Sequence, residues 1–260
     1  MFAIVFSLQD RASMNMFERF LEKGFKETSI EWQRMPIYKK GEVILVRIRE
    51  DIIFANNSLD ELGAEHLIFA SRHKAESGIA TLTVHHTGVF GEADERYGGR
   101  SRELCFTEPD VTRRIYLEML NNYPEGYRVS LEVTHHGPTS IKTPLTFVEL
   151  GSTMEQWLDK EAADFLVSCI LKGLKRNDKA EHVIGIGGNH YASVFSELEK
   201  EKAFGHICPK YSQDFLDRRN LEQMFKKSTA KKAFIDSKGT KKKADVKRMI
   251  EALGYDYELI

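Results

Sequence analysis

Five of the nine histidines of this chain follow strand-like runs of sequence. They are, in chain order, His85 with His86, His135 with His136, and the single His190. Imidazole is a common zinc ligand, and a catalytic zinc takes three protein ligands while keeping one position for a water whose pKa falls to about 7. The spacing therefore indicates a metal site built where strands end.

Two carboxylates end or precede turns in the same regions. Glu132 and Glu149 could bind a metal, take a proton from water, or orient an imidazole, and the sequence leaves these three roles open. The candidate metal ligands are His85, His86, His135, His136, Glu149 and His190, and the candidate catalytic residues are Glu132, His136 and Glu149. The isolated histidines His66, His182 and His206 are predicted to be structural.

The two histidine pairs are predicted to lie at the rim of a sheet. Side chains alternate along a strand, so His86 and His135 each share the apolar face of their strand while their neighbours point the other way. Gly88 and Gly137 follow the pairs and permit sharp turns. Open α/β sheets hold their ligands at such strand ends.

The segment 185–190 resembles a phosphate-binding turn but lacks its full pattern. A dinucleotide fingerprint would need glycine at position 190, where this chain has His190, so no nucleotide cofactor is expected. The backbone of Gly187, Gly188 and Asn189 is a candidate substrate contact for an oxyanion or a terminal phosphate, and a plain tight turn is the alternative. No serine elbow is present, and water is the expected nucleophile.

The charge of the chain is unevenly distributed. The segment 225–260 holds ten Lys or Arg against five Asp or Glu, whereas the chain as a whole carries 38 against 39. Lys241, Lys242 and Lys243 form the longest basic run. We expect this segment either to attract phosphates without reading sequence or to be an ordinary solvated helix face.

Apolar runs alternate with helix-period segments, which is typical of an α/β fold. Because the stretch 36–60 has strand-like runs with no helix between them, the sheet is predicted to be mixed. We expect one domain over 1–260. Strands are predicted at 2–6, 43–48, 66–70, 79–85, 127–134, 145–150, 181–186, 204–208 and 232–236, and helices at 12–23, 108–122, 154–175, 213–227 and 241–253.

Composition favours a soluble, cytoplasmic protein. No stretch approaches the roughly 18 apolar residues of a membrane span, so no membrane partner is expected. The three cysteines show no CxxC spacing, which fits a reducing compartment. A monomer is the expected state.

Several phrases together resemble the archaeal and plant D-aminoacyl-tRNA deacylase family over nearly the whole chain. The longest are Glu132-Val-Thr-His-His-Gly-Pro-Thr139 and Gly185-Ile-Gly-Gly-Asn-His-Tyr-Ala192. Shorter ones are Ser71-Arg-His73, Leu82-Thr-Val-His-His-Thr-Gly88, Tyr97-Gly-Gly99, Phe147-Val-Glu-Leu-Gly-Ser-Thr153 with Trp157, Gly205-His-Ile207 and Ile235-Asp-Ser-Lys-Gly239. His86 and Thr87 depart from the family's pattern, so His85 is the better supported ligand of its pair.

The resemblance implies zinc dependence and a three-layer α/β/α fold of the phosphorylase/hydrolase-like kind, resembling peptidyl-tRNA hydrolase. It also implies hydrolysis of the ester that joins a D-amino acid, or glycine, to tRNA, as a proofreading activity. Two other functions remain open: a zinc-dependent peptidase or amidase, for which the basic segment has no use, and a non-catalytic tRNA-binding module with structural histidines.

Overall fold

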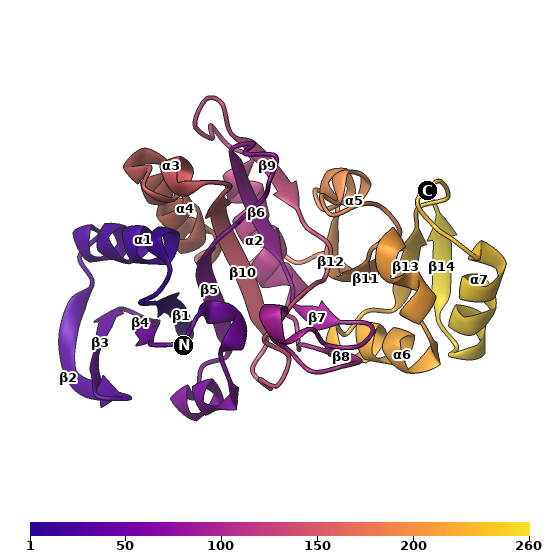
Figure 1. The fold of residues 1–260 in the computed structure, drawn as a ribbon, viewed down its shortest axis with the longest axis horizontal. Coiled ribbons are helices and arrows are strands. Elements are labelled where there is room, and N and C mark those ends of the chain that lie inside the picture. The colour runs from indigo at the N-terminus through magenta and orange to yellow at the C-terminus, as the bar shows by residue number, and fades with distance from the viewer.

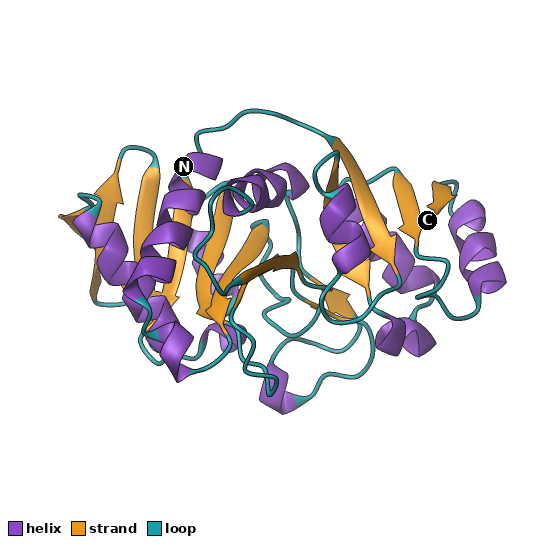
Figure 2. Ribbon diagram, turned by 90° about the horizontal axis from the view of Figure 1, so that it is seen from above, coloured by secondary structure: helices purple, strands orange, loops and turns teal.

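The chain builds two sheets that lie side by side along the molecule, as Figures 1 and 2 show. The structure is a computed structural model that describes residues 1–260. The first sheet is mixed, with strand order β2-β3-β4-β1-β5-β10-β6-β9. Its strands are β1 (Phe2–Ser7), β2 (Lys26–Trp32), β3 (Met35–Lys40), β4 (Val43–Ile48), β5 (His66–Arg72), β6 (Thr81–His85), β9 (Arg128–Leu131) and β10 (Leu145–Gly151).

The second sheet is wholly parallel, with strand order β12-β11-β13-β14. Its strands are β11 (Glu181–Ile186), β12 (Lys202–Cys208), β13 (Lys232–Ile235) and β14 (Asp256–Leu259). The helices are α1 (Arg11–Glu22), α2 (Pro109–Met119), α3 (Met154–Trp157), α4 (Lys160–Gly173), α5 (Ser193–Leu198), α6 (Arg218–Lys227) and α7 (Lys243–Ala252). A small antiparallel pair, β7 (Gly88–Val89) and β8 (Glu103–Leu104), lies between β6 and β9 in the chain.

The predicted mixed sheet is confirmed, and its strand directions decide where polar groups meet. Strand β10 runs parallel to β5 but antiparallel to β6, and β6 is parallel to β9. The end of β6 therefore lies opposite the middle of β10, and His85 pairs with Phe147. Side chains from the end of β6 and the later part of β10 thus share one face of the sheet.

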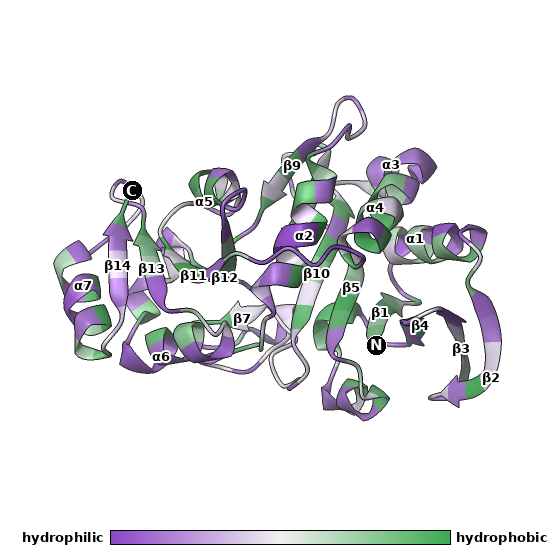
Figure 3. Ribbon diagram, turned by 180° about the vertical axis from the view of Figure 1, so that it is seen from behind, coloured by the Kyte–Doolittle hydropathy of each residue, from purple (hydrophilic) through white to green (hydrophobic).

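The two faces of the first sheet are covered differently, which gives the layered α/β architecture. Leu82, Val84 and Val148 pack in a core of 32 buried residues shared with α1, α2 and α4. Phe69 and Phe147 face the other side, in a core of 15 residues covered by loops and short 3-10 turns. Figure 3 shows β5 and β10 as mostly hydrophobic ribbons, in contrast to the hydrophilic stretches of α6 and α7.

The second sheet also uses both faces. Val183 and Phe234 join the main core, whereas Ile184 and Ile235 pack with α6 and α7 in a separate core of 14 residues. The main core therefore includes residues of both sheets, and one domain over 1–260 stays a prediction.

The predicted helix 154–175 is two helices. Its expected start is confirmed, since Gln156 Oε1 accepts the backbone N–H of Thr153 as in a capping box. The chain then turns at Asp159, whose side chain accepts the N–H groups of the next helix and begins α4. The amide of Asn15 donates to the carbonyl oxygens of Trp157 and Asp159, so tertiary contacts hold the break in place.

Other differences are local. The predicted strand 127–134 ends at Leu131, and the predicted helix 213–227 is a 3-10 turn followed by α6. The hairpin of β2 and β3 lies mostly outside the predicted strands, as do α5 and β14. None of the helices is both long and apolar enough to cross a lipid bilayer.

Candidate active site

Seven histidine and glutamate side chains gather beside the face of the first sheet that lies opposite α1, α2 and α4. They come from the ends of β5 and β6, from β10, from the segment after β9, and from the turn after β11. In overlapping groups of three, their nitrogen and oxygen atoms lie within 4.8 Å of one another. The seven are His73, His85, Glu132, His135, His136, Glu149 and His190.

The strand directions explain this position. His73 follows β5 and His85 ends β6, which runs the other way beside β10. Glu149 of β10 lies between them, with its two oxygens 3.5 Å from His73 Nδ1 and 3.6 Å from His85 Nε2. The site therefore spreads over the face of the sheet, whereas the sequence predicted a site along one rim.

Three of the histidines have their ring nitrogens fixed by the main chain. The Nδ1 atoms of His85, His135 and His136 lie 3.3, 2.8 and 2.6 Å from backbone carbonyl oxygens. A carbonyl oxygen only accepts, so each neutral ring carries its proton on Nδ1 and presents a lone pair on Nε2. Ligating histidines are held in this way in metal sites.

The lone pairs of these rings have no donor to accept from. His85 Nε2 is fully buried without a hydrogen-bond partner. The rings of His85 and His135 stack with centroids 4.4 Å apart, and those of His135 and His136 meet edge to face at 4.3 Å. Packing three acceptors together in a buried place is unfavourable unless a cation lies between them, so the set fits a divalent metal ion.

The carboxylate of Glu132 lies at the centre of the remaining groups. Its oxygens are 2.9 Å from His73 Nδ1, 3.2 Å from His190 Nε2 and 3.5 Å from His135 Nε2. The side chain is completely buried, and no N–H points at either oxygen well enough to make a hydrogen bond. A buried carboxylate needs positive charge beside it, which the His73 imidazolium supplies on one side and a metal ion would add on the other.

The protonation states of His135, His136 and Glu149 suit metal binding. Burial and the neighbouring imidazoles lower the pKa of His136 to about 4 and that of His135 well below its usual range. Burial alone would raise the pKa of Glu149, but His73 and His85 outweigh it and lower that pKa to about 2. Neutral imidazoles and ionised carboxylates are the forms that bind metal ions. Burial lowers the pKa of His85, but Glu149 has the larger effect and raises that pKa above its usual value, so this imidazole must release a proton when it binds a metal ion.

His73 is a cationic member of the cluster. Burial lowers its pKa, but Glu132 and Glu149 have the larger combined effect and raise it to about 11. Its other ring nitrogen lies 2.9 Å from the hydroxyl of Tyr191. The imidazolium therefore compensates the charge of the two glutamates and fixes their position.

The candidate ligand His86 does not reach the cluster. As the alternation predicted, it lies on the apolar face with Leu82 and Val84. Its Nδ1 is 2.9 Å from the carbonyl oxygen of Leu145 and its Nε2 is 3.2 Å from Thr112 Oγ1, on α2. Both nitrogens are used in the core, so His86 is not available as a ligand.

We expect the variant His86→Ala to lose stability but to keep its metal. Two buried hydrogen-bond partners would be left unsatisfied, which lowers the free energy of unfolding by about 1–3 kcal/mol. Denaturant unfolding measures the loss, and elemental analysis of the folded variant should give the same metal content as the wild-type protein. A folded variant that has lost the metal of the wild-type protein would return His86 to the ligand set.

The pair His135 and His136 does not follow the alternation of an ideal strand. Because β9 ends at Leu131, His135 leaves the apolar face and turns into the cluster together with His136. Of the three single histidines predicted to be structural, His66 and His206 are buried in the core. His66 is buried against Thr146, and His206 against Thr134 and the carbonyl oxygen of Cys105.

An open hollow of about 480 Å³ lies over the cluster. Its floor includes His135, His136 and His190. Its walls come from the loop that starts at β7 and from the 3-10 turn after β12. Three aromatic side chains of these walls, each about half exposed, are Tyr97, Tyr211 and Phe215.

A close backbone contact fixes the first wall to the histidines. Gly137 donates its N–H to the carbonyl oxygen of Tyr97 at 2.9 Å. A Cβ atom at position 137 would lie 2.2 Å from the backbone nitrogen of Gly99, so only glycine allows this approach. The turn after His136 thus positions both the imidazole and the wall above it.

The predicted substrate-binding residues lie in two places. Gly187, Gly188 and Asn189 form the turn after β11, and the last two line a second hollow beside the cluster. The basic run lies at the start of α7. There Lys241 Nζ is 2.8 Å from Asp214, Lys242 Nζ is 3.7 Å from the same carboxylate, and Lys243 Nζ donates to the carbonyl oxygen of Ser237.

The sequence reasoning assigned no role to His73 or to the aromatic walls of the hollow. His73 directly follows a strand-like run, as the other ligand candidates do, and that position was the available signal. Tyr97, Tyr211 and Phe215 lie in irregular segments without periodicity, so nothing in the sequence predicted that they share one hollow.

Comparison with known proteins places this chain in a family. The family model described as D-aminoacyl-tRNA deacylase matches residues 61–258. A relative named D-aminoacyl-tRNA deacylase from Thermococcus onnurineus is 34% identical over 96% of this chain and 95% of its own length. One of the same name from Pyrococcus horikoshii is 36% identical over 78% of each chain, and one from Methanosarcina barkeri is 33% identical over 96% of this chain and 87% of its own.

A solved structure shares the whole fold. The crystal structure of a conserved protein of unknown function, AF0625, superposes with a TM-score of 0.93 at 29% identity and covers all of this chain and 95% of that one. Both sheets therefore belong to one shared architecture. The likeness to peptidyl-tRNA hydrolase stays a prediction.

Proposed function

The chain belongs to the D-aminoacyl-tRNA deacylase family, and from this premise we propose that the histidine and glutamate cluster is its hydrolytic centre, held by zinc. The substrate is the ester that joins a D-amino acid to the 3′ end of tRNA. The activity removes wrongly charged amino acids, a proofreading role in the cytoplasm. The observation that carries the proposal is the gathering of three imidazoles, those of His85, His135 and His136, beside two buried, ionised glutamates.

The proposed ligands are His85, His135, His136, Glu149 and His190, in keeping with the donor set that zinc prefers. When bound, the ion would supply a Lewis acid that lowers the pKa of water to about 7 and polarises the ester carbonyl. The number of ions follows from elemental analysis.

Glu132 is the proposed proton acceptor. Its carboxylate is buried and ionised, and it lies within 3.5 Å of the imidazoles of His190 and His135 that floor the hollow. A general base must lie within hydrogen-bond reach of the water that it activates, and this position provides that reach. His73 is a positioning residue, because its Nδ1 lies 2.9 Å from Glu132 and 3.5 Å from Glu149 and orients both carboxylates.

Positioning accounts for the rest of the chemistry. An ester with a ribose leaving group is easier to hydrolyse than an amide, so an oriented water suffices without a covalent intermediate. The aromatic walls of the hollow hold the amino-acid part of the substrate, and we propose that they leave room for the D side chain while excluding the L side chain. The basic segment 225–260 would attract the tRNA body through its phosphates.

The function is tested by turnover on matched substrates. We expect hydrolysis of D-tyrosyl-tRNA to exceed that of L-tyrosyl-tRNA by at least about 100-fold, the order of discrimination that a clash or a lost contact in a shaped pocket provides. A panel of small peptides, assayed with the zinc-loaded protein, should give no turnover. Peptide cleavage without deacylation would support the amidase alternative, and tRNA binding without any turnover would support a binding module.

A further inference from the structure

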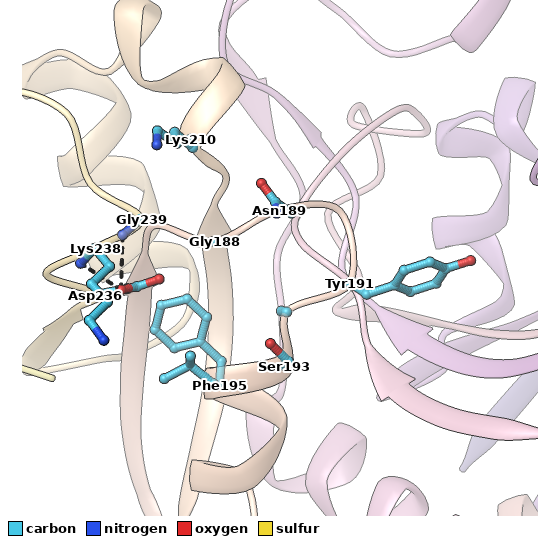
Figure 4. A pocket seen from close by; sticks show the side chains of 11 residues that line it. Gly188, Asn189, Tyr191, Ser193, Phe195, Lys210, Asp236, Lys238 and Gly239 are labelled. Atoms are coloured by element: carbon cyan, nitrogen blue, oxygen red, sulfur yellow. Dashed lines mark hydrogen bonds between the residues drawn. The ribbon is translucent and has the colours of Figure 1, made fainter. Parts of the chain in front are cut away.

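The second hollow lies beside the cluster, at a place where parallel sheets hold ligands. The chain passes from β11 to β12 on one side and then to β13 on the other, so the ends of β11 and β13 flank the point where the connections change direction. Ligands of open parallel sheets bind in the crevice at such a point. Here the crevice is a hollow of about 250 Å³, shown in Figure 4.

The polar groups around this hollow suit one nucleotide. Lys210 and Lys238 stand at its edges, both exposed and neither paired with a carboxylate. The backbone N–H of Gly188 has no acceptor in the chain. Two ammonium groups and a free N–H are donors that a phosphate group accepts from.

A carboxylate faces the same hollow. Asp236 Oδ1 accepts the N–H groups of Lys238 and Gly239, each at 2.9 Å, which leaves Oδ2 for a ligand. An aspartate near a glycine turn in such sheets accepts the hydroxyl of a ribose. With two lysines and one aspartate, the hollow keeps a net charge of +1 and combines a phosphate contact with a ribose contact.

Two glycines keep the hollow open, and a backbone hydrogen bond holds the turn that forms one of its walls. A Cβ atom at position 239 would lie 2.4 Å from the nitrogen of Gly188 and would cover that N–H. Gly188 has a φ of +76°, which favours glycine. Its carbonyl oxygen accepts the N–H of Lys210, so the turn and the lysine are tied together.

The second hollow and the hollow over the cluster are lined by neighbouring residues of the same segments. The segments 188–192 and 210–212 contribute to both hollows, with Lys210 in one and Tyr211 in the other. Within the first of these segments, His190 reaches the cluster, and Figure 4 shows Tyr191 pointing away from the second hollow. A ligand that occupies both hollows is therefore a chain of linked groups with its reactive end over the histidines.

We propose that this hollow binds the penultimate ribonucleotide of the RNA substrate, with the phosphate that links it to the terminal nucleoside held by Lys210, Lys238 and Gly188, and its 2′-hydroxyl held by Asp236. This rests on the proposed function, because it assumes that the acylated end lies in the first hollow. The phosphate contact is made by Lys210 and Lys238, which form no ion pair in the chain and lie apart from the basic run at the start of α7.

The test compares esters of increasing length on the zinc-loaded protein. D-tyrosyl-adenosine has no phosphate, D-tyrosyl-CpA has the one in question, and D-tyrosyl-dCpA lacks the 2′-hydroxyl. The wild-type protein should show a KM for the CpA ester about tenfold or more below that for the adenosine ester. The double variant Lys210→Ala with Lys238→Ala should remove this advantage and flatten the salt dependence of log KM by about 0.7.

The aspartate has its own variant. Asp236→Asn keeps the shape and the Oδ1 contacts but replaces the free oxygen by a donor, so it should equalise the CpA and dCpA esters while leaving the adenosine ester unchanged. The matched control is Lys26→Ala with Lys39→Ala, a cross-strand pair of exposed lysines in the hairpin of β2 and β3, which removes the same charge far from the site. Replacing Lys241, Lys242 and Lys243 should weaken only full-length tRNA.

Direct binding of unacylated CpA and adenosine, measured by calorimetry, provides a readout without catalysis. If the lysine variant keeps the preference for CpA over adenosine in KM and in binding, the proposal is wrong. Equal binding of both by the wild-type protein also overturns it. Failure of the proposed function looks different, since CpA would then bind with this preference while no ester is hydrolysed.

Discussion

Removing the metal with a chelator is expected to lower deacylation of D-aminoacyl-tRNA to about one thousandth or less of its initial rate, and added zinc should restore it. Without a Lewis acid, water near neutral pH has a pKa of about 15.7 and is a poor nucleophile toward the ester. The measurement is the release of the amino acid from labelled tRNA, with the zinc content of each sample determined alongside.

The affinity for tRNA serves as the internal control, because phosphate contacts do not depend on the ion. The dissociation constant for unacylated tRNA should stay within about twofold of the untreated value. Magnesium or calcium should not replace zinc, since both prefer sets of oxygen ligands. Full activity in a preparation shown to be metal-free would rule out the proposed centre.

The variant Glu132→Gln is expected to lower kcat by about 10²- to 10⁴-fold, the usual contribution of a general base. The amide has the same size as the carboxylate but cannot take a proton. Because Glu132 is not placed among the proposed ligands, zinc content and tRNA affinity should remain near wild type. Rapid-quench measurement of a single turnover isolates the chemical step.

A matched control is available in Glu125→Gln, an exposed glutamate in the turn between α2 and β9 that makes the same chemical change away from the site. It should leave kcat unchanged. If Glu132→Gln retains wild-type kcat while Glu149→Gln does not, the proton acceptor is Glu149. If both retain it, the hydrolytic centre lies elsewhere in the molecule.

The fold was predictable from the sequence where local patterns agree with packing. Buried strands such as β1, β4 and β10 are continuous apolar runs, and their bounds agree with prediction within one or two residues. The hairpin of β2 and β3 was missed because its edge strand β2 is half polar and largely exposed. The break between α3 and α4 was missed because it depends on Asn15, which lies far away in the sequence.

The site was predictable as a set of residue types but not as an arrangement. Glu132, Glu149 and five histidines were singled out from the sequence, and the structure brings together both glutamates and all of these histidines except His86. Alternation along an ideal strand put His135 on the apolar face, and it failed there because β9 ends early. His73 joins only through the parallel pairing of β5 with β10, which no local pattern reveals.

The cluster lies at the interface between the part of the chain that forms the first sheet and the part that forms the second. Six of its seven side chains belong to the part of the chain before residue 180, and His190 alone comes from the part that forms the second sheet. There Val133 donates its N–H to the carbonyl oxygen of His190, and Glu132 bridges to Tyr191. An ion bound at this interface would cross-link the two parts of the chain. The same contacts would then set both the alignment of the two sheets and the geometry of the reacting groups.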